Sequence, residues 1–302
     1  MSTTRKIFKV FKSKPTLEGA GVHLKRAFGF GNTDLFDPFL LLDDFRGDSP
    51  EMYQKGFPWH PHRGIETITY VLRGTVAHGD SMGNSGIIGA GDVQWMTAGS
   101  GIIHQEMPKG DPEGKMYGFQ LWANLPRQDK MIDPNYQGVT DLEIPRANLE
   151  NGAEVRVICG EFGDKRGPVK NVTIQPEYLD VSLPAHCVFN HELPTDHTVF
   201  AYVFEGSGIF CENPDPFAYD YEGKNYFDVN RHNELGNTSL VVFGPGEEIK
   251  VTTTENNVRF LLISGKPIRE PIAWYGPIVM NTDEELRVAF EELEKNTFIK
   301  HK

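Results

Sequence analysis

The feature that most constrains the fold is an internal repeat. Tyr70-Val-Leu-Arg-Gly74 matches Tyr202-Val-Phe-Glu-Gly206 at an offset of 132 residues. Gly89-Ala-Gly91-Asp92-Val93 resembles Gly244-Pro-Gly246-Glu247-Glu248 at an offset of 155, and the extra 23 residues fall in an acidic, aromatic insertion around 211–235. Such a repeat indicates one structural module present twice. A length of 302 residues also suits about two domains.

Within each copy the apolar residues follow the period of β-strands. Short apolar runs bounded by Gly, Pro, Asn and Asp predict strands at 65–72, 155–159, 178–183, 199–204, 240–243 and 260–263. Thr282 and Glu285 form a capping box before an apolar stripe, which predicts one helix near the C-terminus. The expected fold class is all-β, with two tandem β-modules and a short C-terminal helix. We expect modules at 1–148 and 149–302, with a boundary that an exchange of terminal strands would blur.

Composition excludes several classes of protein. The formal net charge of −12 argues against direct nucleic-acid binding, which needs a basic surface. No apolar run reaches about 18 residues, so no transmembrane helix is expected. The three cysteines match neither a zinc motif nor a disulfide framework, and no secretory signal precedes the first module. The expected location is the cytoplasm, or also the nucleus in a eukaryotic host.

Two short motifs in the first module carry the chemical signal. His60-Pro-His62 and His104-Gln-Glu106 each place two ligand-type side chains two residues apart, hence on one face of a strand. The 42 residues from His62 to His104 allow a hairpin path that brings the two pairs together inside a barrel. Three neutral imidazoles and one carboxylate suit a divalent first-row metal: Fe, Mn, Co, Ni, Cu or Zn. The motifs therefore predict one metal site in the first module.

One alternative ligand stays open from the residues alone. Glu66 lies four residues beyond His62 and would share the histidine face if the strand continued without a break. It is therefore a second candidate for the carboxylate ligand beside Glu106.

The second module lacks the ligand pattern. The offset of 155 aligns His104 with Arg259 and Glu106 with Leu261, and the offset of 132 aligns the two earlier histidines with Glu192 and Pro194. We therefore expect the second module to be metal-free, with its histidines (His186, His197 and His232) as ordinary surface or core residues.

Longer motifs resemble the pirin family of bicupins. They are Asp37–Asp44, Phe57–Thr67, Gly91–Pro108, Gly118–Trp122, Gly265–Pro271 and Gly276–Asn281. The resemblance implies two cupin (jelly-roll-type) β-barrels packed side by side, with Fe(II) in the N-terminal one. Carried over by position, the metal ligands are His60, His62, His104 and Glu106, which leaves Glu66 as a supporting hydrogen-bond partner.

The resemblance also implies an activity. Pirins are known for cleaving flavonols such as quercetin with O2, as quercetin 2,3-dioxygenases, and here Glu106 would be the catalytic base. Trp95, Met96, Phe119 and Trp122 are candidates for the wall of a substrate chamber, although ordinary core packing is the favoured explanation for each of them. The alternative is a redox-sensing, iron-binding regulatory protein, either a transcriptional cofactor or a modulator of a metabolic enzyme, whose iron state is read by a protein partner. Flavonol cleavage would then be incidental to the physiological task.

Overall fold

The computed structural model describes residues 2–212, 215–223 and 231–301. The chain forms two compact units. The first, here called the N-terminal barrel, consists of residues 14–143, 171–174 and 268–302. The second, the C-terminal barrel, consists of residues 1–13, 144–170 and 175–267.

This division differs from the expected cut between residues 148 and 149. The first strand, β1 (Ile7–Lys12), pairs antiparallel with β22 (Ser239–Phe243) and so belongs to the C-terminal barrel. Residues 268–302, including the C-terminal helix, belong to the N-terminal barrel. The physical reason for the difference is backbone hydrogen bonding, which joins each terminal segment of the chain to the barrel formed by the other half of the sequence.

Two antiparallel sheets build the N-terminal barrel. Their strand orders are β12-β9-β6-β11-β4-β3-β2 and β5-β10-β7-β8. The strands are β2 (Lys14–Glu18), β3 (Val22–Phe28), β4 (Phe39–Asp44), β5 (Phe57–His62), β6 (Ile65–Arg73), β7 (Thr75–Asp80), β8 (Ser85–Ile88), β9 (Val93–Thr97), β10 (Ile102–Lys109), β11 (Tyr117–Asn124) and β12 (Asn135–Val139). A hairpin of β25 (Ala273–Tyr275) and β26 (Ile278–Met280) and the four-residue helix α1 (Thr33–Phe36) complete this barrel with α2 (Asp283–Glu294).

The C-terminal barrel is built the same way around its own core. Its main sheet runs β13-β14-β17-β24-β19-β22-β1-β20, with β21 beside β19 and with the pairs β15-β16 and β18-β23. The remaining bounds are β13 (Arg146–Asn148), β14 (Glu154–Cys159), β15 (Glu161–Phe162), β16 (Lys165–Arg166), β17 (Glu177–Leu183), β18 (Val188–Glu192), β19 (Thr198–Gly208), β20 (Asp220–Tyr221), β21 (Leu235–Gly236), β23 (Glu248–Thr252) and β24 (Val258–Gly265). The insertion around 211–235 lies partly outside the described residues.

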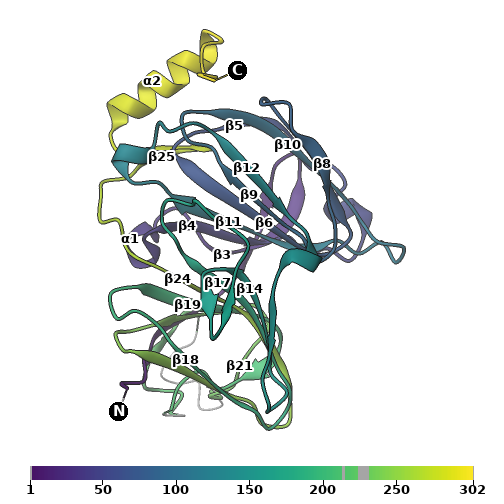
Figure 1. Ribbon diagram of the computed structural model, residues 1–302, viewed down its shortest axis with the longest axis vertical. Helices are drawn as coiled ribbons and strands as arrows, with labels where there is room; N and C mark the ends of the chain where they lie inside the picture. Colours follow the sequence, from purple (N-terminus) through teal and green to yellow (C-terminus); the bar gives the residue numbers. More distant parts are fainter. Residues whose placement is uncertain (1, 213–214, 224–230, 302) are drawn as a thin grey trace. The chain divides into compact units, whose positions relative to one another are not determined.

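The predicted elements are confirmed. The six expected strands correspond to β6, β14, β17, β19, β22 and β24. The C-terminal helix α2 starts at Thr282, whose side chain and that of Glu285 form the expected capping box. Figure 1 shows α2 in yellow next to β25, and its apolar side packs on Ile278 and Met280.

The repeat has a structural equivalent in each barrel. Tyr70 lies in β6, which pairs with β9 and β11, and Tyr202 lies in β19, which pairs with β22 and β24. The glycine that ends each motif, Gly74 or Gly206, has a positive φ of 77° or 65°. A Cβ there would approach a backbone carbonyl at 2.6 or 1.9 Å, so only glycine fits. In the described residues no helix is long and apolar enough to cross a membrane.

Candidate metal centre

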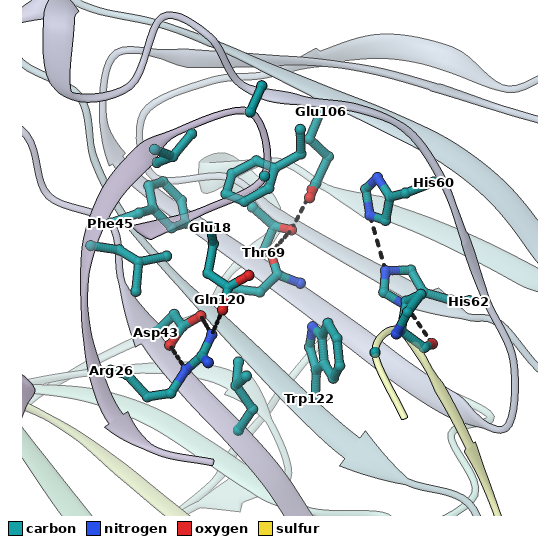
Figure 2. Close-up of a pocket in the computed structure, with 18 of the residues that line it drawn as sticks. Glu18, Arg26, Asp43, Phe45, His60, His62, Thr69, Glu106, Gln120 and Trp122 are labelled. Atoms are coloured by element: carbon teal, nitrogen blue, oxygen red, sulfur yellow. Dashed lines mark hydrogen bonds and ion pairs between the residues drawn. The ribbon is translucent and has the colours of Figure 1, made fainter. Parts of the chain in front are cut away.

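The three predicted histidines lie on two neighbouring antiparallel strands. His60 and His62 are on β5, and His104 on β10 stands directly opposite His60. Figure 2 shows the rings of His60 and His62 turned toward each other at one side of a pocket. One ligand nitrogen from each of the three rings lies within 4.8 Å of the other two. Folding therefore brings the two motifs together.

Two backbone carbonyls fix which ring nitrogens carry protons. Nδ1 of His60 lies 2.8 Å from the carbonyl oxygen of Pro58, and Nδ1 of His62 lies 3.0 Å from that of Pro277. A carbonyl oxygen only accepts, so each Nδ1 donates, and a neutral ring then has no proton on Nε2. The two Nε2 atoms are 3.1 Å apart. Lone pairs this close repel each other unless a cation lies between them.

Burial keeps the rings of His62 and His104 neutral. Desolvation, with a smaller effect of His60, lowers the pKa of His62 to about 3, and desolvation with the neighbouring rings lowers the pKa of His104. Both nitrogens of His104 are buried and have no hydrogen-bond partner among the described residues, a costly state for polar atoms that nothing binds. Neutral imidazoles with unpartnered nitrogens fit a divalent transition metal. The three histidines therefore form a candidate metal site.

Glu106 lies in the same cavity but outside the three-histidine group. Its Oε1 accepts hydrogen bonds from Thr69 Oγ1 at 2.7 Å and Gln94 Nε2 at 2.9 Å. Its Oε2 has no such partner among the described residues. Glu106 lines the cavity beside His60, yet its carboxylate is not among the ligand atoms within 4.8 Å of one another. Its role as the fourth ligand stays a prediction.

Glu66 points into a different environment. Gly64, with a φ of 77°, interrupts the chain between β5 and β6, so the unbroken strand that would align Glu66 with the histidines does not form. The Glu66 carboxylate accepts a bond from Thr97 at 2.8 Å and is fully buried. Burial raises the pKa of Glu66 to about 7, although the Thr97 hydroxyl opposes the rise. Glu66 does not line the cavity that holds His60, His62 and Glu106.

A fourth imidazole, which the sequence motifs did not predict, lies beside the three histidines. His78 on β7 stands opposite Glu106, and its ring centroid is 5.6 Å from that of His104. Its Nε2 lies 3.2 Å from Asp80, and Tyr136 stacks on the ring at 4.9 Å. The i, i+2 spacing of His78 and Asp80 on a strand was the available signal. The sequence contains no signal for the contact with the Pro277 carbonyl, because every residue type has a backbone carbonyl.

The site opens into a cavity of about 740 Å³, within the range of ordinary small-molecule pockets. Trp122 lines it, as expected for a chamber wall, and its ring meets His62 edge-on at 5.0 Å. Trp95, Met96 and Phe119 are buried in the core and do not line the cavity. Of the four proposed wall residues, only Trp122 has that position.

The aligned positions of the C-terminal barrel carry other interactions. Arg259, in the place of His104, forms a bidentate ion pair with Asp180 at 2.9 and 2.6 Å. Leu261, in the place of Glu106, is a fully buried core residue. That the C-terminal barrel binds no metal stays a prediction.

Comparisons with known proteins cover both barrels. Residues 21–123 match the family model described as Pirin, and residues 178–299 match the one described as the Pirin C-terminal cupin domain. A pirin-like protein of Caulobacter vibrioides is 40% identical over 296 residues, 97% of this chain and 99% of that protein. Pirin-like protein 2 of Arabidopsis thaliana is 40% identical over 300 residues, 98% of this chain and 86% of that protein.

A solved structure agrees with the sequence matches. The crystal structure of quercetin 2,3-dioxygenase from Acinetobacter baumannii matches with a TM-score of 0.83 at 32% identity, covering 98% of each chain. The two-barrel cupin architecture expected from the resemblance is thereby confirmed. Since the family models and the relatives extend over both barrels, the chain belongs to the pirin family.

Proposed function

We propose that this protein is a metal-dependent dioxygenase that opens flavonols such as quercetin with O2 and releases carbon monoxide. The observation that carries the proposal is the set of three imidazoles whose nitrogens converge at the wall of an aromatic-lined cavity. The similarity to a quercetin 2,3-dioxygenase supports the same substrate class. The substrates are thus a small aromatic flavonol and dioxygen.

We assign one divalent metal to the N-terminal barrel. Fe(II) is the first choice, with Mn, Co, Ni, Cu or Zn as alternatives, and the assigned ligands are His60, His62, His104 and Glu106. When bound, the metal supplies a Lewis acid that favours ionisation of the flavonol 3-hydroxyl and a redox centre for reaction with O2. The carbonyl oxygens of Pro58 and Pro277 would keep the Nε2 atoms of His60 and His62 aimed at it.

Glu106 is the residue that we assign to proton transfer. Thr69 and Gln94 hold its Oε1, so Oε2 is the oxygen left for both assigned roles and would have to release the metal before it accepts the proton of the 3-hydroxyl. The resulting electron-rich flavonolate reacts with O2, the heterocycle opens, and one ring carbon leaves as carbon monoxide. Trp122 in the cavity wall offers apolar surface for the aromatic rings during this step.

The test uses protein loaded with Fe(II) without oxygen. Quercetin is added, oxygen is admitted, and loss of the flavonol absorbance is followed together with release of carbon monoxide. Turnover is expected in the wild type and in His23→Ala, which changes an exposed histidine on β3, and not in His104→Ala. Turnover that persists in His104→Ala at the wild-type rate would refute the proposal.

A second candidate is a redox-sensing regulatory protein. The observation in its favour is the exposure of two aromatic side chains: Trp59, next to ligand candidate His60, is 54% exposed, and Tyr275, in the cavity wall, is 69% exposed. A protein partner could read the metal state there. Iron that is bound stoichiometrically and cycles between oxidation states without flavonol turnover would favour this role.

A further inference from the structure

A charged cluster lines the same cavity opposite the histidines. Arg26 donates from Nε and Nη2 to both carboxylate oxygens of Asp43, at 2.8 and 2.7 Å, and its Nη2 is 2.9 Å from the carboxylate of Glu18. All three residues line the cavity, and Figure 2 shows them on the side away from His60 and His62. The proposed flavonol chemistry uses none of the three.

The strand register sets the separation between the cluster and the metal site. Arg26, Asp43, Gln120 and Thr69 are directly paired across β3, β4, β11 and β6. Asp43 is therefore two strands away from Thr69, the residue that holds Glu106, or about 10 Å at the strand spacing of a sheet. A ligand that extends from the histidines to Asp43 must have the length of linked aromatic rings.

A contribution to the stability of the fold does not by itself explain why the Arg26–Asp43 ion pair lies in the cavity wall. Asp43 is only 5% exposed, and burial raises its pKa to about 6 even though Arg26 opposes the rise. Buried ion pairs often stabilise a fold less than apolar residues of the same size. The neighbouring Asp44 forms a bidentate pair with Arg46 that does not line the cavity. The strand thus carries one ion pair inside the cavity and a matched one outside it.

The chemistry of the cluster selects one kind of ligand group. One guanidinium and two carboxylates carry a net charge of −1, which disfavours an anionic ligand. The carboxylates accept hydrogen bonds, and Arg26 Nη1, which has no bond in the described part of the chain, can donate. A hydroxyl both donates and accepts, whereas an ammonium group only donates. The cluster therefore fits uncharged hydroxyl groups.

We propose that Glu18, Arg26 and Asp43 form a specificity subsite that binds phenolic hydroxyls of the ligand remote from the metal-binding oxygens. The inference rests on the proposed function and narrows it to polyhydroxylated, uncharged aromatic substrates. Leu41 and Trp122, directly paired in the same wall, supply the apolar surface for the rings between the two ends.

The test measures binding to metal-loaded protein without oxygen, through quenching of the fluorescence of Trp122 and Trp274 in the cavity wall. The two probes are quercetin and 3-hydroxyflavone, which keeps the 3-hydroxy-4-keto group and lacks every remote hydroxyl. Asp43→Asn is expected to raise the Kd of quercetin about ten-fold and to leave that of 3-hydroxyflavone within about two-fold. The matched control Asp44→Asn is expected to change neither Kd.

Glu18→Gln is the second variant in this test. The Glu18 side chain is 40% exposed, so its substitution is expected to leave the fold intact. It is expected to weaken quercetin binding alone, with a higher KM and an unchanged kcat. Equal effects of Asp43→Asn and Glu18→Gln on both probes, or no effect on either, would overturn the inference and leave the proposed function intact. If the wild type binds neither flavonol, both fail.

Discussion

The metal site is expected to be sensitive to single substitutions, because only three imidazoles supply its converging nitrogens. His104→Ala removes one of three converging donors, and bound metal after dialysis is expected to fall from one per chain to nearly none. Glu66→Gln is expected to keep the metal, because Glu66 lies outside the cavity. Metal analysis of both variants beside the wild type is the measurement. If Glu66→Ala lost the metal and Glu106→Ala kept it, the assignment of Glu106 would be wrong.

Glu66 also gives the stability of the N-terminal barrel a pH dependence. Its pKa rises from 4.5 to about 7 in the folded protein, so folding favours the protonated carboxyl. This contribution is fully present below 4.5 and is lost as the pH rises through 7, a change of about 3 kcal/mol. Glu66→Gln stays neutral. Its unfolding free energy relative to the wild type is therefore expected to increase between about pH 5 and pH 8.

The measurement for Glu66 is chemical denaturation of the metal-free protein at several pH values. Glu150→Gln, which changes an exposed carboxylate, is the control. A difference between Glu66→Gln and the wild type that does not change with pH would show that Glu66 is not titrating in this range.

At the scale of elements, the turn after β5 depends on the β25–β26 hairpin. A Cβ at Gly64 would lie 1.9 Å from the carbonyl oxygen of Val279, and the same hairpin supplies the Pro277 carbonyl that orients His62. Gly64→Ala must push the hairpin away. It is expected to cost about 3 kcal/mol or more and to weaken metal binding about ten-fold or more.

Gly83→Ala is the matched control for Gly64→Ala. Gly83 also has a positive φ, 88°, but an added Cβ would meet nothing within 4 Å. Only the backbone cost of about 1 kcal/mol is expected, with unchanged metal affinity. Thermal unfolding and metal titration of both variants separate backbone strain from displacement of the hairpin. Equal metal affinities in the two variants would contradict the coupling.

Local sequence patterns predicted the strands and the helix better than the long-range contacts that hold the site residues in place. Period-two runs and the capping box at Thr282 located strands and the helix, and the i, i+2 spacing found His60 and His62. That Glu66 lies outside the cavity goes with the break at Gly64, where the carbonyl of Val279, more than 200 residues away in the chain, leaves no room for a side chain. Such contacts carry no local residue preference, so a single sequence does not reveal them.

At the scale of the whole molecule, the repeat predicted two barrels but not how the chain is shared between them. Residues 1–13 complete the C-terminal barrel and 268–302 complete the N-terminal one. A repeat shows only that two parts of the sequence are similar. The exchange of terminal strands depends on which sheet edge each terminal segment pairs with, and the repeat does not show that. The Arg26–Asp43 pair was missed for a related reason, since its position in a cavity wall exists only after β2, β3 and β4 assemble.

The exchange of terminal segments leads to a prediction about fragments. A fragment of residues 1–148 lacks the Pro277 carbonyl that orients His62, and it also lacks Glu292 and the Phe298 carbonyl, which hold the buried Arg63 next to that histidine. Metal affinity is therefore expected to fall at least about ten-fold. Because residues 268–302 belong to the same compact unit, co-expression with a fragment of residues 149–302 is expected to restore metal binding.

The measurement is the metal content of fragment 1–148 after co-purification with fragment 149–302. Fragment 149–267 in place of 149–302 is the control, because it supplies everything except the terminal segment. If 1–148 alone bound metal as tightly as the full chain, the histidines would need no support from the C-terminal hairpin.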